Sequence, residues 1–156
     1  MPDQQVRADD RHGQDALDAA EVTEHDCDAS CPVSHVMNGP PLFCDPEVTL
    51  RYVAEVMEAK GLSALVLLRP DGPSAIVTDR DVLEAIASGC DPDATWAGDV
   101  ASTDLVALSP SSTLGEAVEE MVRHHFHHLP VREGSQVIAM VSAGDLLRSL
   151  CHLEAA

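Results

Sequence analysis

The sequence predicts a mixed α/β fold made of two similar units, each a short lead-in strand followed by helix, strand, strand and helix. The segment 43–88 resembles the segment 107–152 without a gap, at an offset of 64 residues. Each segment contains two apolar runs of strand type between amphipathic helices. Such a unit is too small to bury both faces of its sheet, so we expect the two units to pack on each other.

In the first unit, Thr49 is suited to cap a helix that ends at Lys60-Gly61 and carries its apolar residues on one face. The run Ala64–Leu68 is continuously apolar, which is typical of a strand buried on both faces. The composition then predicts a turn, a strand and a helix, at Pro70–Pro73, Ser74–Thr78 and Asp79–Ser88.

The second unit follows the same plan after a connection that contains an Asp-Pro-Asp turn. Thr113 and Glu116 have the spacing of a capping box, which opens a helix to about His124. The two strands and the closing helix are expected at His128–Val131, Gln136–Val141 and Ala143–Leu150.

We therefore divide the chain into a tail at 1–34, a first unit at 35–92 and a second unit at 93–152. The tail has nine acidic residues against two arginines and no sustained apolar period, which predicts that it is mostly disordered. A short helix at Ala16–Val22 is compatible with its composition. Order should begin near Val33, where Val36 and Met37 start a short apolar stretch.

Composition excludes several classes of function. The formal charge of −18, with one lysine, disfavours nucleic-acid and membrane-surface partners. No apolar run approaches the length of a membrane span, and the N-terminus lacks the pattern of a signal peptide. The five cysteines are odd in number and irregular in spacing, unlike a secreted disulfide framework. We expect a cytoplasmic, reduced protein.

One local motif occurs twice. An apolar strand runs into a hydroxyl residue, Thr78 or Ser142, with an aspartate three positions later, Asp81 or Asp145. The simplest interpretation is a helix cap. The same arrangement suits an adenosine nucleotide, because a helix N-terminus attracts phosphate, a carboxylate accepts from ribose hydroxyls, and the strand offers an apolar wall.

With these motifs the chain resembles the CBS (cystathionine β-synthase) domain family, whose tandem pairs are called Bateman modules. Thr49–Met57, Leu62–Leu67 and Ile76–Leu83 are similar to one CBS repeat, and Thr113–Met121, His127–Val131 and Met140–Leu147 to a second. The likeness runs from about Val33 to Leu150 and is strongest to small stand-alone bacterial pairs of the hypoxic-response type. It implies β-α-β-β-α repeats related by pseudo-twofold symmetry, a homodimer, and AMP, ADP, ATP, S-adenosylmethionine or NADH as ligands.

The resemblance also implies which residues bind. The ribose aspartates fall on Asp81 and Asp145, and the hydroxyls that precede them on Thr78 and Ser142. The remaining implied positions are the starts of the central strands and the lead-in segments, at Leu62, Ser63, Ala64, Phe126, His127, His128, Met37, Leu42, Ala101 and Val106. Arg80 is a candidate phosphate partner without a counterpart in the second motif. Since positive charge is scarce, a monophosphate or a bare adenosyl group is expected more readily than ATP.

The chain departs from the family in two ways. Ala75 and Ala139 stand where the family usually has glycine, and the titratable His127 replaces a frequent basic residue.

The main hypothesis is a non-catalytic module that senses energy or stress state through an adenine nucleotide, needs no other cofactor, and acts on an unidentified protein partner. No nucleophile elbow, Walker loop or dinucleotide-binding glycine loop supports an enzyme. One alternative is a metal- or redox-responsive protein that uses His25, Cys27, Cys31 and His35 to hold zinc. Another is a ligand-free dimerisation scaffold. The histidine run from His124 to His128 spans a helix end and a strand start, which opposes a shared metal.

Overall fold

The protein is represented by a computed structural model that describes residues 27–70 and 74–152. Its elements are a 3₁₀ helix η1 (Val33–His35), β1 (Phe43–Cys44), α1 (Leu50–Lys60), β2 (Ala64–Leu67), β3 (Ala75–Thr78), α2 (Asp79–Ala87), α3 (Ala97–Val100), α4 (Leu114–His124), β4 (His128–Glu133), β5 (Gln136–Ser142) and α5 (Ala143–Leu150). The expected fold class is confirmed, and the central helices and strands begin within a residue of their expected positions.

Local capping explains why the helices begin where they do. Thr49 accepts a hydrogen bond from the backbone N–H of Tyr52, and complete capping boxes open α2, α4 and α5. At the end of α1, Gly61 adopts the left-handed conformation that suits glycine.

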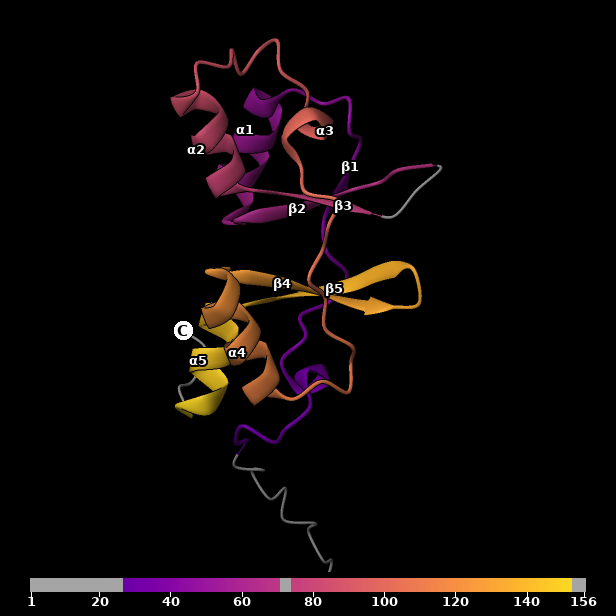
Figure 1. Cartoon of the computed structure of the whole chain (residues 1–156), viewed down its shortest axis with the longest axis vertical. Helices are drawn as coiled ribbons and strands as arrows, with labels where there is room; N and C mark the ends of the chain where they lie inside the picture. The colour runs from indigo at the N-terminus through magenta and orange to yellow at the C-terminus, as the bar shows by residue number, and fades with distance from the viewer. Residues whose placement is uncertain (1–26, 71–73, 153–156) are drawn as a thin grey trace, which may run out of the picture.

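The two units stack through their sheets, and their helices lie on the outer sides (Figure 1). The first sheet has the order β1-β2-β3, with β1 parallel and β3 antiparallel to β2, and the second pairs β4 with β5 antiparallel. Between the sheets, Val66 and Ile76 of the first unit form a buried cluster with Val137 of the second. Burial of these apolar side chains is what holds the units together.

The lead-in segments are exchanged between the units in a symmetric way. Asn38, in the lead-in segment of the first unit, forms an isolated bridge with Met140 of the second unit. The equivalent residues under the 64-residue offset are Ser102 and Ile76, and these two also form a bridge. The bridges Pro32–Thr113 and Thr49–Trp96 obey the same rule. Pairing that repeats under a single offset with the partners exchanged is the signature of the expected pseudo-twofold axis.

The lead-in strand of the second unit is reduced to one bridge, from Leu108 to Val131. In the first unit the backbone N–H of Val66 donates to the carbonyl of Leu42. The equivalent of Val66 is Pro130, which has no N–H to donate. This missing donor explains why the parallel pairing is shorter in the second unit.

The segment 27–34 packs on the second unit (Figure 1), so order begins several residues before Val33, where we expected it. Val33 is fully buried in that unit's core, and its backbone N–H donates to the carbonyl of Ser112 at 2.7 Å. The reason is symmetry, because the equivalent connection 91–98 covers the first unit in the same way. The acidic composition hid this contact. The helix considered at Ala16–Val22 lies outside the described residues.

The short helix α3 was not expected from the sequence. Among the helices of the described ranges, none has the length and apolarity needed to cross a bilayer.

Candidate functional site

Both motif aspartates act as helix caps in the structure. The Asp81 carboxylate accepts from the backbone N–H and the hydroxyl of Thr78, each at 2.7 Å and both through Oδ2. Asp145 accepts from the N–H and hydroxyl of Ser142 at 2.9 and 2.6 Å, again through Oδ2. The capping interpretation therefore accounts for one oxygen of each carboxylate and leaves the other for a further contact.

The second oxygen distinguishes the two motifs. Asp145 Oδ1 accepts from the side-chain amide of Asn38 at 3.2 Å and from Arg148 at 3.4 Å. Within residues 27–70 and 74–152, Asp81 Oδ1 has no hydrogen-bond partner. The carboxylate of the first motif is thus the one that can accept a ligand hydroxyl without displacing a protein group.

A cavity of about 70 Å³ joins the first motif to the second unit. It is lined by Thr78, Asp79, Arg80, His125, Phe126, His127 and His128. Related backbone bonds hold its two sides: Asp79 N donates to Ser63 O at 3.0 Å and Ala143 N to His127 O at 2.9 Å. Five of the predicted ligand residues therefore share one cavity.

His128 lies between the two acidic helix starts. Burial is the largest influence and lowers its pKa, the charge of His127 acts in the same direction, and Asp79 and Asp145 oppose the shift. The neutral imidazole is therefore favoured in the folded protein. Asp79 belongs to the first unit and His128 to the second, so this influence acts across the contact between the units.

The other predicted residues are divided between the two cores. Met37 and Val106 pack against the core of the second unit, and Ala101 against that of the first. Leu42 lies beside β2, where its carbonyl accepts from Val66. Each lead-in segment thus crosses from one unit to the other, and Met37 and Leu42 lie at the two ends of one such crossing. Leu62 and Ser63 precede β2, and Ala64 begins it.

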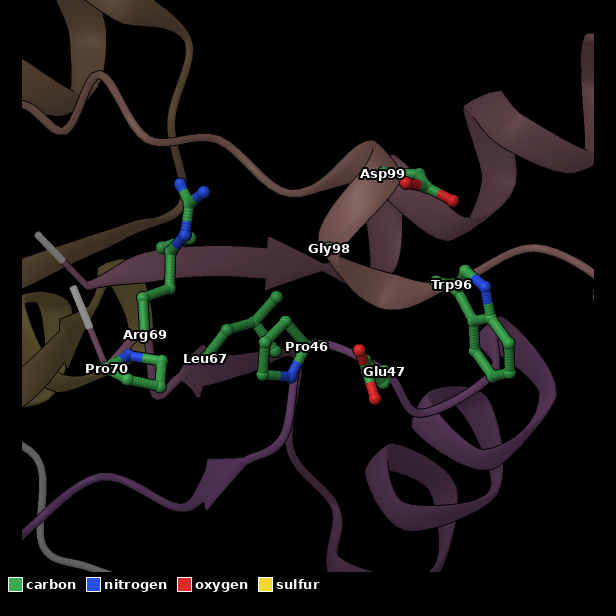
Figure 2. Close-up of a pocket in the computed structure, with 9 residues that line it drawn as sticks. Pro46, Glu47, Leu67, Arg69, Pro70, Trp96, Gly98 and Asp99 are labelled. Carbon is green, nitrogen blue, oxygen red and sulfur yellow. The ribbon is translucent and has the colours of Figure 1, made fainter. Parts of the chain in front are cut away.

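A larger cavity, of about 580 Å³, lies elsewhere on the first unit and contains none of the predicted ligand residues. Residues around the ends of β1 and β2 and in the connection between the units line it, as Figure 2 shows: Pro46, Glu47, Leu67, Arg69, Pro70, Trp96, Gly98 and Asp99. Two carboxylates, Glu47 and Asp99, outnumber Arg69 there, which disfavours a phosphate. Size alone does not make this cavity the adenosyl site.

Sequence reasoning missed three residues of the site. Asn38 was not among the predicted residues, although the 64-residue offset makes it the equivalent of Ser102 in the other lead-in segment. Asp79 and His125 line the small cavity, and their positions next to Thr78 and Phe126 were the available signal. Asp79 matters most, since it brings negative charge to the helix start that was expected to receive a phosphate.

A separate cluster forms in the segment 27–35, which ends with η1. The ligand atoms of Cys27, Cys31 and His35 all lie within 4.8 Å of one another. The contact with Cys27 is the largest influence on Cys31 and raises the pKa of its thiol. His25 lies outside the described residues. The ring of His124 stacks on Phe126 and its Nε2 lies 3.3 Å from Glu120.

Comparison with known proteins places these features in a family. The family model of the CBS domain matches residues 33–88 and 97–152. The mitochondrial CBS domain-containing protein CBSX3 of Arabidopsis thaliana is 29% identical over 121 residues, which cover 74% of this chain and 59% of that protein. This chain therefore spans less than two thirds of that relative. Hypoxic response protein 1 of Mycobacterium tuberculosis is 26% identical over 117 residues, covering 74% of this chain and 82% of that protein.

Solved structures share the fold. An uncharacterised conserved protein of Pyrococcus horikoshii has a TM-score of 0.74 at 22% identity over 83% of this chain and 99% of its own. The CBS pair of MJ0100, in complex with 5′-methylthioadenosine and S-adenosyl-L-methionine, has a TM-score of 0.67 at 15% sequence identity. The match covers 76% of this chain and 98% of that chain. The structure of Hypoxic Response Protein I with two coordinated zinc ions has a TM-score of 0.65 at 24% sequence identity, and the match covers 76% of this chain and 98% of that protein. With two matching domains and this fold, the chain belongs to the CBS domain family, as a tandem pair.

Proposed function

We propose that this CBS pair is a non-catalytic regulatory module that binds an adenosine-containing ligand between its two repeats, at the Asp81 side. The observation that carries the proposal is the small cavity, which brings Thr78 and Arg80 of one repeat to Phe126, His127 and His128 of the other. A ligand held there contacts both repeats and so can change how they sit against each other.

Each part of an adenosyl group has a suitable partner in this cavity or next to it, with Asp81 adjoining the lining residue Arg80. The unpaired Oδ1 of Asp81 can accept a ribose hydroxyl, because capping uses only Oδ2. Phe126, 43% exposed, offers an aromatic face to the base. Arg80 and the start of α2 supply positive charge.

The charge of the cavity favours a monophosphate, a sulfonium or an uncharged adenosyl compound over a triphosphate. Asp79 lies in the same lining as Arg80 and offsets its charge, and the neutral form of His128 adds none. The adenosyl ligands of the MJ0100 pair, a thioether and a sulfonium, are of this class.

Binding requires the cavity to widen, since about 70 Å³ is well below the roughly 300–1,000 Å³ of small-molecule sites. At the Asp145 side, a ribose must also replace the contact from Asn38. We therefore infer that the Asp81 side binds first and that opening of the cleft is the signal passed to a partner protein.

We further propose that the working unit is a homodimer. Leu83 on α2 and Leu147 on α5 are equivalent under the 64-residue offset and are 68% and 60% exposed. A second copy of the same pseudo-symmetric surface can cover both leucines in one isologous interface.

Isothermal titration of the reduced full-length protein with AMP, ADP, ATP, NADH, S-adenosylmethionine and 5′-methylthioadenosine tests the function. We expect at least one adenosyl compound to bind, and the variant Asp81→Ala to weaken that binding more than Asp145→Ala does. Absence of heat and of any thermal shift with every compound at millimolar concentration contradicts the proposal.

A further inference from the structure

The segment 27–35, which includes η1, brings two thiols and an imidazole to one point, and the adenosyl site uses none of them. Cys27, Cys31 and His35 are spaced four residues apart, and their ligand atoms lie within 4.8 Å of one another. Both cysteines are unbridged and half-buried, and His35 is exposed. Among the described residues no other group of three or more His, Cys, Asp or Glu side chains meets this criterion.

The same segment covers the N-terminus of α4. The backbone N–H groups of Leu114 and Gly115 donate to the carbonyls of Cys31 and Ala29 at 2.8 and 2.9 Å. A Cβ at Gly115 would lie only 3.2 Å from the carbonyl oxygen of Ala29, so the absence of a side chain allows this close approach. Whatever fixes the segment therefore also caps α4.

The pseudo-symmetric connection in the first unit is fixed by an ion pair. Arg51, on the first turn of α1, makes two hydrogen bonds to the carboxylate of Asp93. The equivalent of Arg51 is Gly115, which has no side chain, and the equivalent of Asp93 is Ala29. The second unit has thus lost the cross-link that its counterpart uses.

We propose that Cys27, Cys31 and His35 bind one Zn²⁺ ion, which replaces this cross-link and holds the segment 27–35 on α4. Two thiolates and an imidazole are ligands that zinc prefers, and the exposed side of the cluster leaves a fourth position for water or another donor. Tetrahedral zinc places its ligand atoms about 3.5–3.8 Å apart, so small side-chain rotations suffice from the separations observed. Binding releases the thiol protons to solvent.

Asp28 is not part of the group whose ligand atoms meet, and its Oδ1 accepts from the N–H and hydroxyl of Ser30 at 2.7 and 2.6 Å. These bonds fold the turn between the two cysteines and so help to bring the thiols together. The histidines at 124–128 do not bring three ligand atoms together in this way, so a variant in that run serves as a control.

The first test measures metal in the full-length protein, reduced and then dialysed against limiting zinc. We expect about one zinc ion per chain, and cobalt in its place should give thiolate-to-cobalt charge-transfer absorption and the intense visible bands of a tetrahedral site. Cys27→Ser, Cys31→Ser and His35→Ala should each lower the affinity by at least about 10- to 100-fold, the loss that even an outer-shell substitution causes. Cys151→Ser and His124→Ala are the matched controls and should keep it.

The second test asks whether the metal holds the segment. Zinc at about ten times its dissociation constant should slow amide exchange at Leu114 and Gly115 roughly tenfold, because it binds only the docked segment. The equivalent amides of Leu50 and Arg51, which donate to Thr95 and Pro92, provide an internal control that should not change.

Three results overturn the proposal: no zinc or cobalt uptake by the reduced protein, loss of metal in His124→Ala but not in Cys27→Ser, or unchanged exchange at Leu114 and Gly115 in the metal-bound protein. A Cys27–Cys31 disulfide that persists under thiol reductant also overturns it, in favour of a redox pair.

Discussion

Replacing Asp81 by alanine should separate its two roles, because a second carboxylate in the chain performs only one of them. Asp81 closes the capping box of α2 with Thr78 and also offers Oδ1 to the proposed ligand. Glu116 closes the capping box of α4 with Thr113 in the same way, with its carboxylate 2.7 Å from the Thr113 N–H. Asp81 directly follows Arg80, which lines the small cavity, whereas Glu116 lies in the first turn of α4, at the opposite end of that helix from the lining residue His125. Glu116→Ala is therefore the matched control for Asp81→Ala.

The two effects differ in size and in the measurement that reveals them. Loss of a cap costs about 0.5–2 kcal/mol, so each variant should lower Tm by roughly 2–8 °C for a protein of this size. Loss of a charged acceptor for ribose hydroxyls costs a further 1.5–3 kcal/mol of binding free energy, which is about 10- to 100-fold in Kd. Only Asp81→Ala should show this second loss.

The assay combines thermal unfolding without ligand and isothermal titration with the tightest-binding adenosyl compound. If Asp81→Ala and Glu116→Ala bind that compound with the same Kd, the aspartate is a cap and nothing more, and the assignment of the ribose acceptor is wrong. If neither variant changes Tm, the capping boxes contribute less to stability than their geometry indicates.

Four further outcomes follow from the structure. Arg80→Ala should weaken AMP but not 5′-methylthioadenosine in titration calorimetry, because only the phosphate needs the guanidinium; equal losses contradict this role. Burial lowers the pKa of His128, so the unfolded chain binds this proton more readily and the free energy of unfolding should fall as the pH drops through 6.5. The variant His128→Gln should flatten that part of the curve of Tm against pH. Parallel curves for the variant and the parent would refute this role of His128. His125 caps α4 at a φ of 56°, so His125→Gly should raise the free energy of unfolding in urea by about 1 kcal/mol, whereas a decrease shows that its side chain is needed. The double variant Leu83→Asp, Leu147→Asp should be monomeric in light scattering where the parent is dimeric, and an unchanged mass places the interface elsewhere.

The helices and central strands could be predicted from the sequence because their signals are local. Thr113 and Glu116 are three residues apart, and both ends of their capping box are visible in the sequence. The apolar run at β2 needs no knowledge of its neighbours to indicate a buried strand. The 64-residue offset then extended each local inference to the second unit.

What the sequence did not reveal depends on contacts between distant segments. Asn38 meets Asp145 across 107 positions, and no local pattern marks that pair. The docking of 27–34 was hidden in part because backbone groups make several of its contacts, such as the hydrogen bond from Leu114 N–H to the Cys31 carbonyl, which any side chain permits. The prediction of a disordered tail rested on composition, which does not register such contacts.

The two repeats share a backbone framework and differ at a few equivalent positions that each change one physical property. Val66 becomes Pro130, which removes a donor from the parallel pairing, and Arg51 becomes Gly115, which removes an ion pair. These substitutions leave the exchanged bridges between the units intact, so the backbone arrangement of the two repeats stays the same. A third difference, Asn38 in one lead-in segment where the other has Ser102, makes the two clefts chemically different, because Asn38 contacts Asp145 whereas Asp81 keeps an oxygen available. A pair built this way should bind its ligand unequally at its two sites, since symmetry of the backbone does not restore symmetry of the donors and acceptors.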